Sequence, residues 1–314
     1  MNDIYPIDIW HVIFHHCDLL SQLKLIIVCS DFYHSFYITD LYNIPDIYKN
    51  KLTKLVLQQR KFSRLVQLNI QGNKNINNIS FLSNLKKLRV SYYCGIDQQG
   101  IQGLNLIELD INRNKKIKDV SFMTNLKKLY ISGSGIDQKG IKGLDLITFS
   151  LDTNNKINDI SFMTNLKKLC ISKSCGVDQS GIRGLDLIIL DADSNEKIND
   201  VSYMTNLKKL YALGCCGIDQ QGIKGLDLIE LSANNNDKIN DVSFMTNLKK
   251  LDAYSCGIGQ QGIKGLNLIE LDADWNKKIK DVSFMTSLKK LKARSLCGID
   301  QQGIQGLDLI VFHL

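Results

Sequence analysis

Residues 106–144 decide the fold, and they read LIELDINRNKKIKDVSFMTNLKKLYISGSGIDQKGIKGL. Two segments within this stretch begin alike, with leucine at the first and fourth positions and an apolar residue at the sixth, and then diverge. Apolar and polar residues alternate in Leu109-Asp110-Ile111 and Leu129-Tyr130-Ile131, which predicts short strands. Because the two strands start about 20 residues apart, we expect parallel neighbours, each followed by a compact outer turn.

The second segment carries a motif that recurs through most of the chain. NLKKL stands at 84–88, 125–129, 165–169, 206–210 and 247–251, and SLKKL stands at 287–291. One unit of 40 or 41 residues is therefore present six times. Such self-similarity is typical of a solenoid, whose repeats bury a face only by stacking on neighbours. We expect function on the surface that stacking creates, which favours a binding protein over an enzyme.

Each segment type also has its own polar marker. The first type has an asparagine three residues past the sixth position, at Asn73, Asn114, Asn154, Asn195, Asn236 and Asn276. We expect these amides to bond backbone groups that the turning chain leaves unpaired. The second type has Cys94, Cys175, Cys216, Cys256 and Cys297 before its glycine, with Ser134 in the odd copy. A thiol or hydroxyl there can donate weakly to a nearby carbonyl.

These alternating segments resemble the leucine-rich repeat family, whose core is L-x-x-L-x-L-x-x-N/C. The resemblance covers residues 52–314, and similar repeat-rich proteins occur in amoebae and large DNA viruses. It implies an α/β solenoid over 51–314, with a curved parallel sheet of about 13–14 short strands. The outer segments are short and glycine-rich, so we expect turns and single helical turns on the convex side. Leu52, Leu55 and Leu57 are expected to form an early strand in a capping repeat.

The first 50 residues differ from the repeats and predict a small helical domain. Apolar residues lie at helical spacing in residues 4–36, as in Leu20, Leu23 and Ile27, and Asp18 and Ser30 lie where helix caps would fall. Three short helices can make only a small core, which favours a partner or packing against the repeats.

This N-terminal segment resembles the F-box, a helical module that docks on the Skp-type linker of cullin ubiquitin ligases. An F-box followed by leucine-rich repeats is itself a known family plan. Tyr5 and Ser30 depart from the usual F-box pattern. The resemblance implies that the linker-binding surface comprises Pro6, Ile9, Ile13, Phe14, Leu20, Leu23, Val28 and Cys29. An amphipathic helical cap on the solenoid is the alternative interpretation.

Composition places further bounds on function. The longest apolar runs, such as Leu25–Cys29, are far shorter than the roughly 20 residues of a membrane span. Nothing after Met1 resembles a secretory signal, and the nine cysteines suit reduced thiols better than a disulfide framework. We therefore expect an intracellular protein, in the cytoplasm or nucleus.

The residue patterns disfavour several kinds of chemical site. The cysteines fall one per long unit and lack the close pairing of a tetrahedral zinc site. His11 and His15 share a helix face, but an ordinary surface pair is the favoured interpretation. The glycine spacing in GIDQQGIKG lacks the Lys-Ser/Thr of a phosphate loop. We predict no catalytic residue, no cofactor and no metal site.

Nucleic-acid binding is the weaker alternative to protein binding. Residues 1–50 carry a net charge of −4 and residues 51–314 a net charge of +11. Lysines such as Lys115, Lys116, Lys277 and Lys278 align along one edge. Acidic residues share their turns and no aromatic side chains are interleaved, so a solvated edge is favoured.

The candidate partner-binding surface is the concave sheet face, which the third, fifth and seventh strand positions line. At the third position lysine in one type faces Glu108, Glu230 or Glu270 in the other, which indicates structural charge pairs. The fifth and seventh positions vary among copies. The candidate residues are Asp110, Tyr130, Asp152, Asp191, Asp193, Tyr211, Asp252, Tyr254, Asp272 and Asp274, with Trp275 just beyond.

Aromatic anchors beside carboxylates suit a basic protein segment, although drift after duplication would also produce variation. The leading hypothesis is a non-catalytic interaction scaffold, a substrate-recruiting F-box subunit of a cullin-type ubiquitin ligase. The alternative is a leucine-rich repeat interaction protein that has no ligase role and sequesters its partner.

Overall fold

The computed structural model describes residues 13–14, 16–28 and 30–313. They fall into two compact units, residues 1–144 and 145–314. The first unit contains α2 (Leu19–Val28), α3 (Ser30–Ser35), β1 (Asp40–Leu41), α4 (Asp46–Lys49), α5 (Lys54–Leu57), the 3₁₀ turn η1 (Arg60–Phe62), β2 (Gln67–Asn69), β3 (Lys87–Arg89), η2 (Gln99–Ile101), β4 (Glu108–Asp110), β5 (Lys128–Tyr130) and η3 (Lys139–Ile141).

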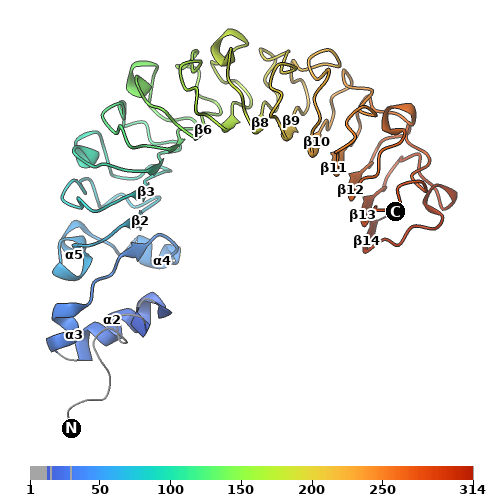
Figure 1. Ribbon diagram of the computed structural model, residues 1–314. Helices are drawn as coiled ribbons and strands as arrows, with labels where there is room; N and C mark the ends of the chain where they lie inside the picture. Colours follow the sequence, from blue (N-terminus) through green and yellow to red (C-terminus); the bar gives the residue numbers. More distant parts are fainter. Residues whose placement is uncertain (1–12, 15, 29, 314) are drawn as a thin grey trace. The chain divides into compact units, whose positions relative to one another are not determined.

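The second unit is built from repeats alone. It contains β6 (Thr148–Ser150), β7 (Lys168–Cys170), η4 (Ser180–Ile182), β8 (Ile189–Asp191), β9 (Lys209–Tyr211), β10 (Glu230–Ser232), β11 (Lys250–Asp252), η5 (Gln261–Ile263), β12 (Glu270–Asp272), β13 (Lys290–Lys292), η6 (Gln302–Ile304) and β14 (Val311–His313). Figure 1 shows its strands on the inner side of the coils and its turns on the outer side.

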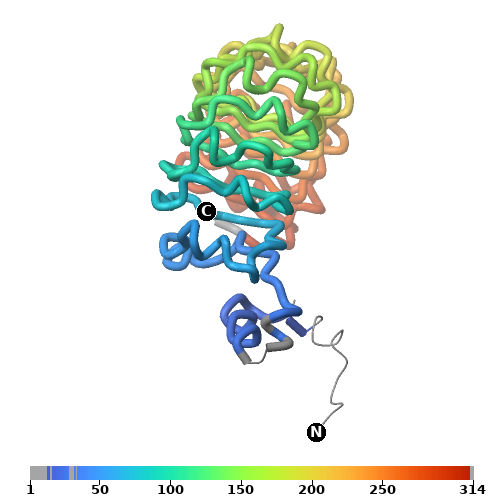
Figure 2. Tube along the Cα trace, turned by 90° about the vertical axis from the view of Figure 1, so that its left-hand side faces the viewer, coloured from blue at the N-terminus to red at the C-terminus, as the bar shows by residue number. Residues whose placement is uncertain are grey.

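Strands in each unit pair in parallel and in chain order, as the repeat predicts. Leu109 of β4 lies opposite Leu129 of β5, and Leu231 of β10 lies opposite Leu251 of β11. These central leucines are almost completely buried because the period of two turns them away from the sheet face. Figure 2 shows the coils of the first unit stacked one upon another. The predicted strands of the repeats and the parallel-sheet solenoid are confirmed.

The asparagine column confirms the predicted role of the first segment type. The Asn236 amide donates to the carbonyl oxygens of Ala212 (2.9 Å) and Ile218 (3.1 Å), and its own oxygen accepts from the Lys238 N–H (3.0 Å). Asn236 is 1% exposed. Such a side chain satisfies backbone groups that would otherwise be buried without partners, so each asparagine joins neighbouring coils.

The column continues into the helical segment. The Asn73 amide donates to the carbonyl oxygens of Lys49 (2.7 Å) and Leu52 (3.0 Å). Lys49 is the last residue of α4, and Leu52 follows that helix. In addition, β1 lies within the segment predicted to be helical and pairs with β2. Residues 40–52 thus take part in the first coil, and a domain boundary at residue 50 remains a prediction.

The predicted strand at Leu52, Leu55 and Leu57 is wrong. Residues Lys54–Leu57 form helix α5, whose first turn is capped when the Thr53 hydroxyl accepts from the Val56 N–H (3.3 Å). Apolar residues three apart fit one turn of helix as well as a strand, and the N-cap threonine decides in favour of the helix.

Outer segments consist mainly of turns, with short 3₁₀ turns in most copies of the second type, as expected. Glycine is needed where these turns approach the preceding coil: a Cβ atom at Gly222 would lie 2.0 Å from the Asn199 carbonyl oxygen. The cysteines pack beside these turns. Cys256 donates from its sulfur to the Ala253 oxygen (3.3 Å), and the Ser134 oxygen accepts from the Ile136 N–H (3.3 Å) in the odd copy.

Candidate functional site: the sheet face and the N-terminal helices

Charged side chains at the third strand position pair across neighbouring strands. In the first unit the Lys87 Nζ atom lies 3.2 Å from a Glu108 oxygen. In the second unit Glu270 lies between Lys250 (3.1 Å) and Lys290 (2.9 Å). The predicted opposite-charge pairs are therefore confirmed at these strands. Because the lysines are partly exposed, each pair contributes at most about 1 kcal/mol.

The two candidate residues of the first unit lie side by side on β4 and β5. Asp110 is only 6% exposed, and an oxygen of its carboxylate lies 2.8 Å from the Arg89 Nε atom. Burial raises the pKa of Asp110 despite the nearby guanidinium. Tyr130, in register with Asp110, is half-buried. The Asp110 carboxylate therefore forms an ion pair within the protein and is poorly accessible to a partner.

Three carboxylates gather on the face of the second unit, and Asp152, Asp191 and Asp193 are here called the acidic patch. All three are half-buried. Asp152 accepts from the backbone N–H (2.9 Å) and the hydroxyl (2.8 Å) of Ser172. Burial, together with the negative charges of Asp152 and Asp193, raises the pKa of Asp191. The local field in this patch favours a positively charged partner group.

Tyr211, the next candidate along the face, is tied to a neighbouring strand. Its hydroxyl donates to a Glu230 oxygen at 2.8 Å. Burial and the bond to this carboxylate raise the pKa of Tyr211 to about 12. The half-buried ring stays neutral near pH 7 and offers an apolar surface beside the acidic patch residue Asp191, with which it is in register.

The remaining acidic candidates line β11 and β12. Asp252 accepts from the Ser232 hydroxyl (2.8 Å), and a carboxylate oxygen of Asp272 lies 2.9 Å from the Lys292 Nζ atom. Tyr254 and Asp274 are half-buried, and the Asp274 carboxylate accepts from the Arg294 N–H. The sheet face of this unit is therefore acidic at the fifth and seventh positions, with Lys292 the cation paired there.

Trp275 follows this group and is the most exposed of the candidates, at 48%. Its φ of +59° lies in the left-handed region. The residue before each asparagine of the column has a similar φ; these residues are Gly72, Arg113, Thr153, Ser194, Asn235 and Trp275. The fold thus demands this conformation, which costs a non-glycine residue roughly 1 kcal/mol. A large aromatic side chain at a strained, exposed position is typical of a recognition site.

A recurring glutamine has a structural role that the sequence did not predict. Gln220 donates to the Asp241 oxygen (2.8 Å) and accepts from the Asn240 and Asp241 N–H groups (3.0 and 2.9 Å). Gln98, Gln179 and Gln260 make the equivalent bonds. Their recurrence after G-[IV]-[DG] was the available signal.

The lysine edge considered for nucleic acids also has a structural role. The Lys116 Nζ atom donates to the Gly95 oxygen (3.4 Å), and Lys278 donates to the Cys256 oxygen (3.3 Å). Lys197 and Lys238 make the same kind of bond. In these four turns one lysine thus bonds the neighbouring coil.

The described residues of the F-box-like set lie in different environments. Ile13 and Leu20 are 41% and 54% exposed, whereas Phe14 is buried and stacks on Phe36 at 4.7 Å between ring centroids. Leu23 lines a cavity beside α2. Val28 ends α2. Pro6, Ile9 and Cys29 lie outside the described residues.

Helix α2 begins with a cap of the predicted kind. The Asp18 carboxylate accepts from the Ser21 N–H at 2.8 Å, and this bond lowers the pKa of Asp18. No group of three or more His, Cys, Asp or Glu side chains in the described part of the chain is arranged to hold a metal ion. No described helix has the length and apolar character needed to cross a membrane.

Three features together define a leucine-rich repeat solenoid: the stacked coils, the columns of asparagine and cysteine side chains, and the open face of the parallel sheet. Among the solved structures that are similar to this chain are two bacterial proteins. An internalin (InlF) from Listeria monocytogenes matches at 20% identity over 87% of this chain and 90% of its own, with a TM-score of 0.55. The leucine-rich repeat protein LIC12759 from Leptospira interrogans matches at 16% identity over 93% of this chain and 80% of its own, with a TM-score of 0.52. At these identities the likeness shows the fold. No family model and no curated protein matches the sequence.

Proposed function

We propose that this chain is a non-catalytic recruiting subunit. It holds a protein target on its sheet face and docks through its N-terminal helices on the Skp-type linker of a cullin ubiquitin ligase. A leucine-rich repeat solenoid with an open face is typical of protein-interaction scaffolds. The proposal places the protein in the cytoplasm or nucleus, where its cysteines stay reduced.

One observation supports the linker part of the proposal: two apolar side chains of α2 are largely exposed to solvent. Leu20 is 54% exposed and Ile27 is 76% exposed, and seven residues separate them along one face of the helix. Ile13, from the preceding turn, is 41% exposed. A soluble protein usually buries such a face, so its exposure supports a docking surface.

A binding experiment with the purified linker tests this part. The full chain should bind the Skp-type linker, and Leu20→Asp and Ile27→Asp should each weaken binding by roughly tenfold or more, because a charge cannot enter an apolar contact without cost. The matched control is Ile47→Asp, a change at a 63% exposed isoleucine of α4 that should leave binding unchanged. If the wild-type chain does not bind the linker, the ligase role fails and the partner-sequestering scaffold becomes the better description.

The acidic and aromatic character of the second unit supports a basic segment as the target. Asp191 and Asp193 supply the charge, and Trp275 supplies an exposed anchor. Proteins captured by the full chain should be lost with Asp193→Lys and with Trp275→Ala. Retention by both variants would exclude this face. The control is Asp237→Lys, at an exposed turn residue outside the sheet.

A further inference from the structure

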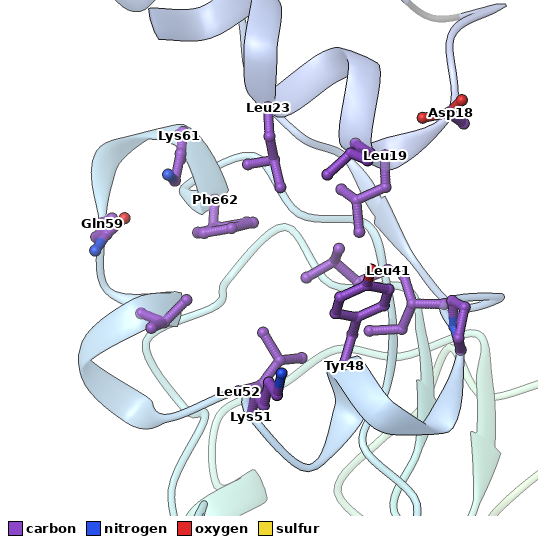
Figure 3. A pocket seen from close by; sticks show the side chains of 14 residues that line it. Asp18, Leu19, Leu23, Leu41, Tyr48, Lys51, Leu52, Gln59, Lys61 and Phe62 are labelled. Atoms are coloured by element: carbon purple, nitrogen blue, oxygen red, sulfur yellow. The ribbon is translucent and has the colours of Figure 1, made fainter.

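A cavity beside α2 shares Leu20 and Leu23 with the proposed linker-binding set, but linker docking does not explain the cavity itself. Its volume is ≈ 500 Å³, within the range of small-molecule pockets. Leu19, Leu20 and Leu23 of α2 line it, together with residues from α4 to α5 that include Tyr48, Leu52 and Val56. Figure 3 shows Leu19, Leu23, Tyr48 and Leu52 around a common space.

Part of the cavity lining is apolar and buried. Leu41, Ile44 and Phe62, which also line it, are 1%, 7% and 4% exposed. Polar side chains in the lining are few: Asp18, Tyr48, Lys51, Gln59 and Lys61. A ligand that suits this site therefore has a long apolar body and very few hydrogen-bonding groups.

Charge at the rim is unevenly distributed. Lys51 and Lys61 line the cavity, and neither has a carboxylate within 4 Å among the described residues, whereas Lys49 nearby pairs with Asp46 at 2.7 Å. The Lys61 Nζ atom lies 5.5 Å from the centre of the Phe62 ring, at the edge of the apolar lining. In Figure 3, Gln59 lies beside Lys61, and Asp18 lies on the far side of Leu19 and Leu23.

We propose that this cavity binds an amphipathic carboxylate of the fatty-acid class. The head group would accept from the Lys61 ammonium and the Gln59 amide, which are donors suited to a carboxylate. The aliphatic chain would run past Phe62 and Leu52 toward Tyr48 and Leu41, where the removal of its methylene groups from water would favour binding. Charge complementarity thus separates this ligand from an uncharged lipid of the same length.

Calorimetric titration of the full chain with decanoate, below its micelle-forming concentration, tests the proposal, with 1-decanol as the uncharged analogue. Decanoate should bind with one-to-one stoichiometry and should bind more tightly than decanol. Val56→Phe fills the cavity and should weaken binding by about tenfold or more, because it removes volume that the chain occupies. The matched control is Leu55→Phe on the same helix, since Leu55 is 78% exposed and does not line the cavity.

The charge requirement has its own pair of variants. Lys61→Gln should weaken the binding of decanoate by about tenfold and leave the binding of decanol unchanged, because only the contact between the ammonium and the carboxylate is lost. Lys54→Gln, at an exposed lysine of α5, should change neither. Equal affinity of the wild type for decanoate and decanol overturns the proposal, and so does unchanged decanoate binding in Val56→Phe.

A measurement on the wild-type chain alone guards against a variant that fails to fold. A photoactivatable fatty acid should label residues within 19–62, and decanoate should compete with this labelling. Labelling confined to other segments would overturn the proposal.

Discussion

Asn236 shows how a single side chain joins two coils. Its amide group makes three hydrogen bonds to backbone groups at 2.9–3.1 Å, and the side chain itself is buried. Asn236→Ala leaves these groups without partners and should lower the free energy of unfolding by about 3 kcal/mol, measured by urea denaturation. The control is Asn199→Ala, at an exposed asparagine, which should stay within about 0.5 kcal/mol of the wild type. Equal effects of the two changes would contradict a structural role for the column.

Trp275 shows the opposite balance, because its backbone conformation favours another residue. Gly72 occupies the equivalent place in the first repeat with a φ of +74°. Trp275→Gly should therefore raise the free energy of unfolding by about 1 kcal/mol, since glycine adopts this φ without steric cost. Thermal and urea unfolding would check this. A gain in stability together with a loss of target binding would indicate that the tryptophan is kept for recognition; a large loss of stability would instead assign it to packing.

At the scale of an element, the cysteines form a column whose thiols are held neutral. Burial raises the pKa of Cys175, Cys216 and Cys256 from the ordinary 9.0 to about 11. A raised pKa in the folded state means that this contribution to stability is complete below pH 9.0 and is lost as the pH rises toward about 11. The fold should therefore weaken across this alkaline window.

Ser134 provides the matched change for this column, because it occupies the cysteine position in one copy. The triple variant Cys175→Ser, Cys216→Ser and Cys256→Ser keeps a hydroxyl that does not titrate near pH 10. Its stability should fall less than that of the wild type between pH 9 and pH 11, as measured by urea denaturation at each pH. Parallel pH profiles for both proteins would show that other groups control the alkaline loss.

The outer and N-terminal elements mark the limit of prediction from sequence. The strands of the solenoid were predictable because the alternation of apolar and polar residues around Leu109 and Leu129 recurs in every repeat of 40 or 41 residues. Helix α5 was not, since Leu52, Leu55 and Leu57 fit either periodicity, and only the Thr53 cap and tertiary packing decide between them. Gln220 was overlooked for a different reason: its recurring position was visible, but its backbone partners come from the next coil.

The candidate face was predictable in position but not in detail. Counting from the first leucine placed Asp110 and Asp193 on the sheet face, yet Asp110 is buried against Arg89, whereas Asp193 belongs to the acidic patch. The fifth-position neighbours differ: Asp110 lies in register with Arg89 of the preceding strand, whereas the acidic-patch residue Asp191 lies in register with Cys170 of its preceding strand. Register between strands, which the repeat does not state, decides which carboxylates face a partner.

For the whole molecule, the net charge of +11 over residues 51–314 is a weak guide to partners. Lys116 and Lys278 donate to carbonyl oxygens of the neighbouring coil, and Lys250 and Lys290 pair with Glu270. At physiological salt we expect no binding to single-stranded or duplex DNA or RNA tighter than about 10⁻⁴ M, the weak end of non-specific binding. Fluorescence anisotropy of labelled oligonucleotides over a range of salt concentrations would measure this. Tighter binding with a steep salt dependence would restore the nucleic-acid alternative.

The alternation of lysine and glutamate at the third strand position also limits how such a gene can change length. Lys209, Glu230 and Lys250 follow one another on β9, β10 and β11. Loss of the single strand and turn that carry Glu230 would place the ammonium groups of Lys209 and Lys250 on adjacent strands. It would also place two segments of the cysteine-containing type next to each other. Loss or gain of 40 or 41 residues preserves both the charge order and the asparagine column. The shortest insertion or deletion that keeps both patterns is therefore a pair of strands with their turns. Natural variants of this array should differ in length by whole pairs of strands.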